Sequence, residues 1–228
     1  MSSGQATVNK KAVVLLSGGL DSSTVLYYVK AKGFEPHCLV FDYGQKHKKE
    51  IEQAKKIAKL SGSEFSVIKF HLPWKGSSLI DKAKKIPSHK ISEIGKEGSL
   101  PSTYVPARNT IFLSFGLSLA ETIKAQAIFI GANALDFSGY PDCRPKYFFA
   151  WSKLIKSLGL QNGKIKIVAP LIDKTKSEII KLGLKLKVPY SLTWSCYAGG
   201  KKTCGNCDSC KLREKGFSEL KRNDPASI

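Results

Sequence analysis

The sequence predicts an α/β protein with a doubly wound, parallel sheet of five strands. Three observations indicate this class: five short runs that are apolar throughout, helical patterns between them, and short connections between most neighbours. Continuous apolar runs are typical of parallel strands, which are buried on both faces. Such sheets bind ligands at the carboxyl ends of their strands, so polar motifs at these ends form the candidate site.

The expected strands are the apolar runs at residues 12–16, 38–41, 65–70, 127–130 and 165–168. The expected helices lie at residues 20–32, 46–60, 110–123 and 146–158, with a shorter one from residue 174 to about 183.

One connection, at residues 71–109, is much longer than the others. It contains Pro73, Pro87 and Pro101 and many lysines, and it has no clear sheet pattern. Long connections in compact domains are often lids or binding loops. We therefore expect a mobile loop over the active site.

The length of 228 residues allows one sizeable α/β domain with a small appendage. No apolar run reaches the length of a membrane span, and residues 1–9 are polar and lack the apolar stretch of a signal peptide. We expect a cytoplasmic protein without a membrane partner.

The net charge is +19, from 37 Lys and Arg against 18 Asp and Glu. Such a charge fits a nucleic-acid partner, anionic small substrates or a lysine-rich surface. The lysines are spread over expected helices, and no RNA-binding module signature is present. We therefore interpret the charge as solvated surface that attracts small anions, and we expect no specific nucleic acid as a partner.

The most informative motif is Ser17-Gly18-Gly19-Leu20-Asp21-Ser22, which directly joins the first expected strand to the first expected helix. Free backbone N–H groups in such a turn, small hydroxyl side chains and the positive end of the helix dipole form a cradle for phosphate. The GxxxxGK[ST] nucleotide loop has a lysine and a different spacing. The alternative is an ordinary glycine-rich turn, which Asp21 and Ser22 disfavour.

Four further polar clusters fall where the expected crevice lies. They cover residues 42–47, 104–110, 131–145 and 193–200. In this order after the SGGLDS loop, they resemble the 7-cyano-7-deazaguanine synthase family of the ATP pyrophosphatases, over about Lys11 to Phe217. The stretches SGYPDCRP and TWSCY are the parts that we consider specific to that family.

The resemblance implies an adenine nucleotide alpha-hydrolase-like fold and a carbon–nitrogen ligase of queuosine or archaeosine biosynthesis. Such an enzyme uses ATP with Mg²⁺ to convert 7-carboxy-7-deazaguanine and ammonia into the nitrile 7-cyano-7-deazaguanine, through an activated carboxylate and an amide. Because a carboxylate is a poor electrophile, its oxygen must first become a leaving group, and the protein supplies positioning and charge stabilisation. We expect only these small-molecule substrates as partners, and a homodimer.

The resemblance also implies roles for individual residues. Those expected to hold ATP are Leu16, Ser17, Gly18, Gly19, Leu20, Asp21, Ser22, Ser23, Thr24, Val25 and Leu26. Those expected to take part in catalysis are Asp21, Ser22, Lys176, Arg108, Arg144 and Asp136.

Several of these assignments leave alternatives open. Asp21 is expected to hold Mg²⁺ or orient the loop, unless it caps the helix. Lys176 is expected to neutralise phosphate charge, unless it is a surface lysine. Arg108 or Arg144 suits the substrate carboxylate, because a guanidinium offers two parallel donors. Asp136 or Asp142 suits the donor edge of a guanine-like base, and loop-fixing salt bridges are the alternative for all four.

The cysteines Cys196, Cys204, Cys207 and Cys210 have the spacing C-x7-C-x2-C-x2-C. This spacing allows four thiolates to converge on one tetrahedral ion, so we expect one structural zinc. Disulfides are disfavoured in the cytosol, and an iron–sulfur cluster is the other alternative. We expect residues 1–190 to form the ATP-pyrophosphatase-like domain and residues 191–228 a zinc-binding segment packed on it.

Two other functions compete with this interpretation. A tRNA-thiolating or other amidotransferase-type ATP pyrophosphatase would also explain the SGGLDS loop and the basic charge. A non-enzymatic zinc-ribbon nucleic-acid module would explain the charge and the cysteines, but it would leave that loop and the five-strand pattern unexplained.

Overall fold

The computed structural model describes residues 10–94, 100–133, 139–159 and 163–226. Within them, one parallel sheet of five strands has the order β3-β2-β1-β4-β5. The strands are β1 (Lys10–Leu15), β2 (Phe34–Asp42), β3 (Glu64–Lys69), β4 (Ala127–Phe129) and β5 (Lys166–Val168). The five predicted strands and the doubly wound class are confirmed, with boundaries shifted by a few residues.

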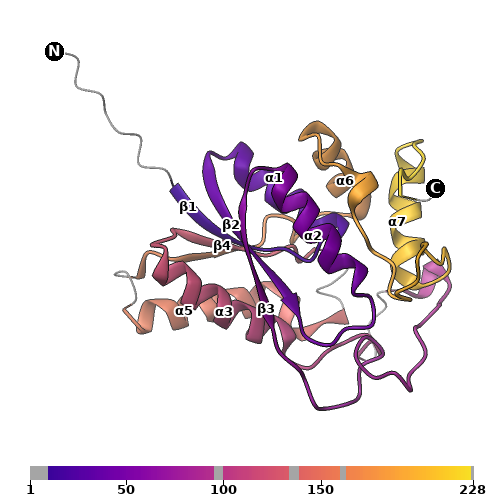
Figure 1. Cartoon of the computed structure of the whole chain (residues 1–228), viewed down its shortest axis with the longest axis horizontal. Coiled ribbons are helices and arrows are strands. Elements are labelled where there is room, and N and C mark those ends of the chain that lie inside the picture. The colour runs from indigo at the N-terminus through magenta and orange to yellow at the C-terminus, as the bar shows by residue number, and fades with distance from the viewer. Residues whose placement is uncertain (1–9, 95–99, 134–138, 160–162, 227–228) are drawn as a thin grey trace.

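The helices cover both faces of this sheet (Figure 1). They are α1 (Leu20–Ala31), α2 (Lys49–Leu60), α3 (Arg108–Thr122), α5 (Pro145–Ser157), α6 (Lys176–Lys185) and α7 (Asp208–Glu219). Side chains of α1, α2, α6 and α7 belong to one apolar core, and those of α3 and α5 belong to the other. The alternation along β1 separates the two, since Val14 faces the first core and Val13 the second.

The order of the strands places a crevice above the centre of the sheet. The chain leaves β1 toward β2 and later returns to β4 on the other side of β1. Such a reversal is the topological switch point at which open α/β sheets bind ligands. The loop at residues 17–22, hereafter the glycine loop, follows β1 at this point.

The long connection of residues 71–109 packs onto the molecule in its described parts. Ser77, Ser78 and Leu79 are buried, and the backbone N–H of Lys46 donates to the Leu79 carbonyl at 2.9 Å. Further along, the backbone N–H of His89 donates to the Asp208 carboxylate at 2.7 Å. The connection therefore links the start of α2 with the start of α7, and its expected mobility stays a prediction.

Helix α7 was not predicted, because its sequence is polar and its apolar residues form no clear stripe. Arg213 anchors it: the buried guanidinium donates to the Asp224 carboxylate at 2.6 and 2.9 Å and to the Tyr190 carbonyl at 3.0 Å. In the described part of the chain, no helix combines the length and the apolar character that a membrane crossing requires.

Candidate active site

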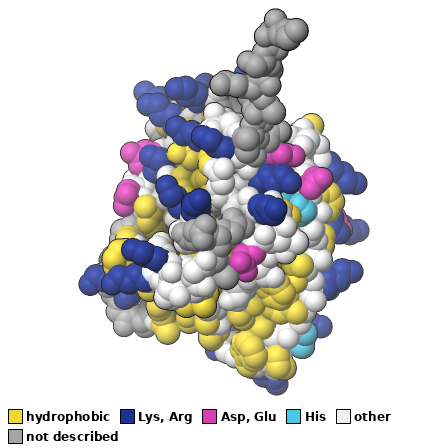
Figure 2. Space-filling view, turned by 90° about the vertical axis from the view of Figure 1, so that its left-hand side faces the viewer, with side chains coloured by type: hydrophobic (Ala, Val, Ile, Leu, Met, Phe, Trp, Pro, Cys, Tyr) yellow, Lys and Arg dark blue, Asp and Glu magenta, His cyan; other side chains and the backbone are white. Residues whose placement is uncertain are grey.

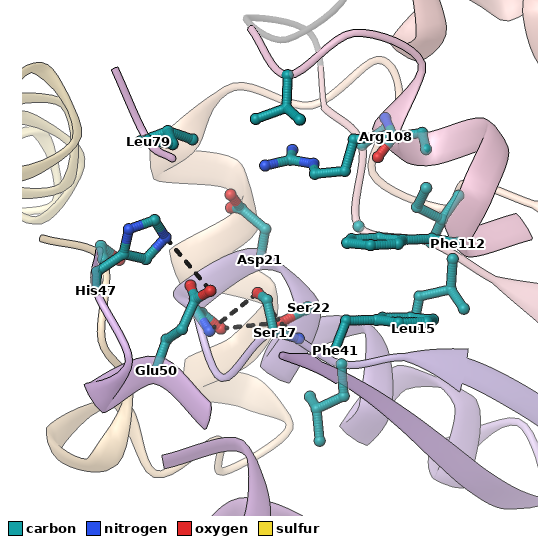
Figure 3. Close-up of a pocket in the computed structure, with 18 of the residues that line it drawn as sticks. Leu15, Ser17, Asp21, Ser22, Phe41, His47, Glu50, Leu79, Arg108 and Phe112 are labelled. Carbon is teal, nitrogen blue, oxygen red and sulfur yellow. Dashed lines mark hydrogen bonds and ion pairs between the residues drawn. The ribbon is translucent and has the colours of Figure 1, made fainter. Parts of the chain in front are cut away.

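A cavity of about 230 Å³ opens at the carboxyl ends of the central strands (Figure 3). Its walls come from the glycine loop, the end of β2, the start of α2, the connection of residues 71–109, the start of α3 and the cysteine-bearing segment. The four polar clusters expected around a crevice all contribute described residues to it, among them Tyr43, Arg108, Asp142 and Tyr197.

The glycine loop fits the cradle that its sequence predicts. Ser17 Oγ and Ser22 Oγ lie 2.9 Å apart, and the Ser17 backbone N–H donates to Ser22 Oγ at 3.2 Å. Gly18 has a φ of +79°, and a Cβ there would lie 2.3 Å from the Glu50 carbonyl oxygen. Only glycine tolerates both this backbone conformation and this contact, so α2 packs directly against the loop.

Asp21 lies in the first turn of α1 and binds the first residue of α6. Lys176 Nζ lies 2.8 and 2.7 Å from the two Asp21 carboxylate oxygens, and Asn133 Nδ2 donates to the same carboxylate at 3.3 Å. At Gly216 of α7, a Cβ would lie 2.7 Å from Lys176 Cγ. Packing by α7 therefore holds the lysine side chain toward Asp21 rather than toward solvent.

Arg108 begins α3 and lines the same cavity (Figure 3). Its Nη1 donates to the Tyr43 hydroxyl at 3.2 Å, and its guanidinium lies 5.9 Å from the Tyr43 ring. The buried Nε has no hydrogen-bond partner among the described residues. This half-buried guanidinium therefore keeps donor capacity for an anion in the cavity.

Asp142 is buried beside Arg108. Burial raises the pKa of this carboxyl, while the N–H of Asn109 and the charge of Arg108 lower it. The Asn109 N–H donates to the Asp142 carboxylate at 3.1 Å, and Asn109 Nδ2 donates to the Asp142 carbonyl at 3.1 Å. Asp142 thus fixes the start of α3, as a loop-fixing contact would, and also faces the cavity.

A second acidic group enters the cavity from α2. Glu50 Oε1 lies 3.3 Å from His47 Nε2, and Gln45 Nε2 donates to the same oxygen at 3.1 Å. Gln45 is itself fixed at the end of β2, because its Oε1 accepts from the Tyr43 N–H at 2.9 Å. His47 lies two residues before the start of α2 and is buried against the cavity.

The four predicted metal ligands converge. The sulfur atoms of Cys196, Cys204, Cys207 and Cys210 all lie within 4.8 Å of one another. The Cys204–Cys210 and Cys207–Cys210 sulfur distances are 4.0 and 3.5 Å. Thiolates at about 2.3 Å from a tetrahedral ion lie about 3.8 Å apart, so this cluster can hold a metal ion.

The cluster is tied to the glycine loop. The Trp194 backbone N–H donates to the Gly18 carbonyl at 2.9 Å, and the Trp194 indole N–H donates to the Cys196 carbonyl at 2.9 Å. Ordering of the cysteines therefore orders one wall of the cavity. The two remaining cysteines lie elsewhere: Cys38 is in the core, where burial raises its pKa to about 12, and Cys143 lies at the cavity.

Several candidate residues lie away from the cavity. Among those expected to hold ATP, the structure brings Leu16, Ser17, Gly19, Leu20, Asp21 and Ser22 to the wall, but not Gly18, Ser23, Thr24, Val25 or Leu26. The last four are buried in the packed body of α1, where Thr24 Oγ1 lies 2.8 Å from the Tyr190 hydroxyl. A helix turns its successive residues to different sides, so the wall ends after its first turn.

Of the two arginine candidates, the structure places Arg108 at the cavity and Arg144 outside it. Arg144 is exposed and occupies the N-cap position of α5, where its side chain makes no capping hydrogen bond. Lys176 does not line the cavity, but its Nζ contacts the carboxylate of Asp21, which does line it. Asp136 lies outside the described residues.

The sequence reasoning missed Glu50 and the aromatic floor formed by Phe41 and Phe112. The two rings stack 4.0 Å apart with an interplanar angle of 3°. Glu50 looked like one charge of an exposed amphipathic helix, and only its position three residues after His47 connects it with a polar motif.

Comparison with known proteins identifies relatives along almost the whole chain. The family model described as queuosine biosynthesis protein QueC matches residues 11–221. A 7-cyano-7-deazaguanine synthase of Trichodesmium erythraeum is 54% identical over 221 residues, covering 94% of this chain and 99% of that protein. The enzyme of the same name from Picrophilus torridus is 55% identical over 212 residues, covering 92% and 87%.

Among solved structures, the NMN synthetase of Francisella tularensis has a similar fold. Its TM-score is 0.52 at 14% sequence identity, with 94% of this chain and 78% of that chain covered. This likeness supports the α/β architecture. The match of the family model and the high identity to its members go further: this chain belongs to the QueC family of queuosine biosynthesis proteins.

Proposed function

We propose that this protein is a 7-cyano-7-deazaguanine synthase, an ATP-dependent carbon–nitrogen ligase. The observation that supports this most directly is one cavity that joins a phosphate-binding type of loop to a half-buried arginine with spare donors. Family membership and the names of the relatives supply the reaction. In it, 7-carboxy-7-deazaguanine and ammonia become the nitrile through an activated carboxylate and an amide.

We assign ATP to the glycine loop. Backbone N–H groups of residues 17–22 would bind the phosphates at the start of α1, where the helix dipole favours negative charge. Asp21 would hold Mg²⁺. Lys176 would neutralise phosphate charge by forming an ion pair with the bound nucleotide as well as with Asp21. The 2.7 Å contact of the two side chains beside the loop supports these roles, because it places both charges next to the proposed phosphate site.

We assign the substrate carboxylate to Arg108. A planar guanidinium can bind a carboxylate through two parallel N–H donors, and Arg108 Nε is buried without a partner among the described residues. Asp142, beside it, would accept from the donor edge of the deazaguanine ring. Asp136, the other candidate for that edge, keeps this role as a prediction.

We further propose that the four cysteines hold zinc. Their sulfur atoms are spaced as around a single tetrahedral ion. In a four-iron cluster each thiolate binds a different iron, so the sulfurs would lie farther apart. Four thiolates leave no open position, which makes the ion structural. Thiolates free for a metal also favour a reducing compartment such as the cytoplasm.

The discriminating experiment incubates the purified protein with ATP, Mg²⁺ and ammonium and a panel of deazapurine acids, and analyses products by mass spectrometry. The proposal expects the nitrile from 7-carboxy-7-deazaguanine, only when ATP is present. A tRNA-thiolating enzyme would consume ATP only with tRNA and a sulfur donor, and a binding module would consume none. The predicted homodimer is tested separately, by light scattering of the same sample.

A further inference from the structure

The proposed reaction, on which this inference rests, needs a base that removes protons from nitrogen. At neutral pH ammonia is present almost entirely as ammonium, which has no lone pair with which to attack carbon. Ammonium carries four N–H bonds and a nitrile nitrogen carries none. All four protons must therefore leave the nitrogen during the reaction. A positioned side chain with a pKa near the working pH is the efficient acceptor for such protons.

Most proton acceptors on the cavity wall are committed to other contacts. Asp21 is held by Lys176 at 2.7 Å, and Asp142 accepts the Asn109 N–H at 3.1 Å. Burial raises the pKa of Tyr43, and its hydroxyl accepts from Arg108. Among the described residues of the wall, His47 is the one histidine, and histidine is the side chain that changes charge near neutral pH.

The geometry of His47 suits proton transfer. Its side chain is 5% exposed, and Nε2 lies 3.3 Å from Glu50 Oε1, so a proton on this nitrogen would be shared with a carboxylate. Its Nδ1 is buried and has no hydrogen-bond partner among the described residues. The ring is therefore held through Nε2 alone, whereas a core histidine would have both nitrogens satisfied.

Glu50 completes the pair. Its carboxylate is held by Gln45 Nε2 at 3.1 Å, and its side chain is 14% exposed. Figure 3 shows the His47–Glu50 pair on the wall of the cavity that Ser17 and Asp21 also line. A carboxylate and an imidazole nitrogen side by side attract a small cation that carries N–H donors.

We propose that His47 and Glu50 form the ammonium site of this enzyme, with His47 as the base. Glu50 binds ammonium, and the neutral His47 ring, with its own proton on Nδ1, accepts one N–H proton at the lone pair of Nε2, where the carboxylate stabilises the imidazolium. The lone pair thus freed forms the C–N bond to the activated carboxyl carbon. The C–O bond to the ATP-derived group then breaks, its electron pair stays on the leaving oxygen, and the second proton that the attacking nitrogen loses passes to the Glu50 carboxylate, which leaves the neutral amide.

The charges around His47 come from several elements. Glu50 lies on α2, which begins two residues after His47, the Tyr197 ring lies 5.8 Å from the His47 ring, and Asp21 of α1 lines the same cavity. Arg108 lines the same cavity and adds a positive charge there. Glu50 and Asp21 favour a positively charged partner between them, and Lys176 offsets part of the charge of Asp21.

The test compares two nucleophiles. Hydroxylamine is largely neutral at pH 7 and traps an activated carboxylate as a hydroxamate without prior deprotonation. In His47→Gln, we expect kcat/KM for total ammonium at pH 7 to fall by about 100-fold or more, the scale of a general base. Hydroxamate formation should fall far less. Raising the pH should restore the ammonium reaction by about tenfold per pH unit, as free ammonia increases.

Two further variants sharpen the test. Glu50→Gln keeps the size of the side chain and should show the same selective loss, so the test does not depend on one variant folding. His37→Gln is the matched control, because His37 also contacts a glutamate, Glu64, at 3.2 Å but lies outside the cavity. It should leave both reactions unchanged.

The outcomes distinguish a failure of the proposed function from a failure of the proposed ammonium site. Wild type that makes neither nitrile nor hydroxamate from 7-carboxy-7-deazaguanine overturns the proposed function and this inference with it. Active wild type with an equal loss of both reactions in His47→Gln and Glu50→Gln overturns the inference alone, and so does ammonium use in these variants at the wild-type rate.

Discussion

Lys176 and Asp21 lie 155 positions apart in the chain, and the lysine Nζ contacts both oxygens of the aspartate, at 2.8 and 2.7 Å. The contact joins the start of α6 to the start of α1, directly beside the glycine loop. The sequence left a structural alternative open for each residue: Asp21 could have been only a helix cap, and Lys176 only a surface lysine. Both side chains are mostly buried, with 25% of Asp21 and 15% of Lys176 exposed, so removal of one charge leaves the other largely shielded from water.

Asp21→Asn and Lys176→Met should each reduce ATP-dependent turnover by about 100-fold or more, because each removes charge beside the transferring phosphate. Each single change leaves the other charge unpaired and should cost about 1–3 kcal/mol in the free energy of unfolding. The double variant should regain part of that stability and none of the activity. Denaturant unfolding and steady-state kinetics measure the two effects.

The control for this pair is Lys215→Met. Lys215 and Glu219 form an exposed contact of 3.7 Å on α7, and such pairs contribute less than about 1 kcal/mol. The variant should keep full activity. Full activity in Asp21→Asn would instead show that the pair only caps and joins helices.

Gly18→Ala should destabilise the protein far more than Gly33→Ala. Both glycines have a positive φ, of +79° and +77°, so both variants bear the strain of this conformation, about 1–2 kcal/mol. Only at Gly18 would the new Cβ meet backbone, 2.3 Å from the Glu50 carbonyl, whereas nothing lies within 4 Å at Gly33. Thermal unfolding and ATP binding should both separate the two variants, and equal effects would contradict the tight packing of α2 on the glycine loop.

Arg108→Lys should raise the KM for 7-carboxy-7-deazaguanine by about 10- to 100-fold, since a lysine cannot form the two parallel hydrogen bonds of a guanidinium. The KM for ATP should change little. Arg144→Lys is the matched change at an exposed position outside the cavity and should alter neither constant. The reverse ranking of the two variants would assign the carboxylate to Arg144.

Cys204→Ser and Cys210→Ser should lose the bound metal, measured as about one zinc per chain in the wild type by elemental analysis. Chelation should lower the melting temperature, because metal binding contributes directly to folding. Cys38→Ser should keep the metal, since Cys38 lies in the core of the sheet. A brown wild-type protein that contains iron would contradict the zinc assignment.

The sequence predicted the sheet well because each strand is a short apolar run that must be buried on both faces. Val13 and Val14 face opposite cores, so β1 is apolar at successive residues and could be recognised without an alternation of apolar and polar residues. The glycine loop and the cysteine cluster could also be predicted, because each is formed by residues that lie close together in the sequence. Helix α7 was missed because its stability comes from Arg213 and its contacts with Tyr190 and Asp224, which are tertiary.

The wall of the cavity was harder to predict, because it depends on which segments meet in space. Arg108 and Arg144 precede helices in similar polar motifs, and only the fold brings one to the cavity. Glu50 lies in a lysine-rich helix that looks exposed, yet the contact with Gly18 turns this part of α2 inward. The charge of +19 was predicted to be solvated surface, and Figure 2 shows Lys and Arg scattered over one face among acidic and apolar side chains.

The central claim is that this chain transfers ammonia nitrogen to a carboxyl carbon at the expense of ATP. The most direct measurement supplies nitrogen-15 ammonium with 7-carboxy-7-deazaguanine and ATP, and follows the products by mass spectrometry. The account predicts 7-cyano-7-deazaguanine with one heavy nitrogen in its nitrile, formed only when ATP is consumed. Consumption of ATP without heavy nitrogen in any deazaguanine product, or sulfur transfer to tRNA, would contradict it.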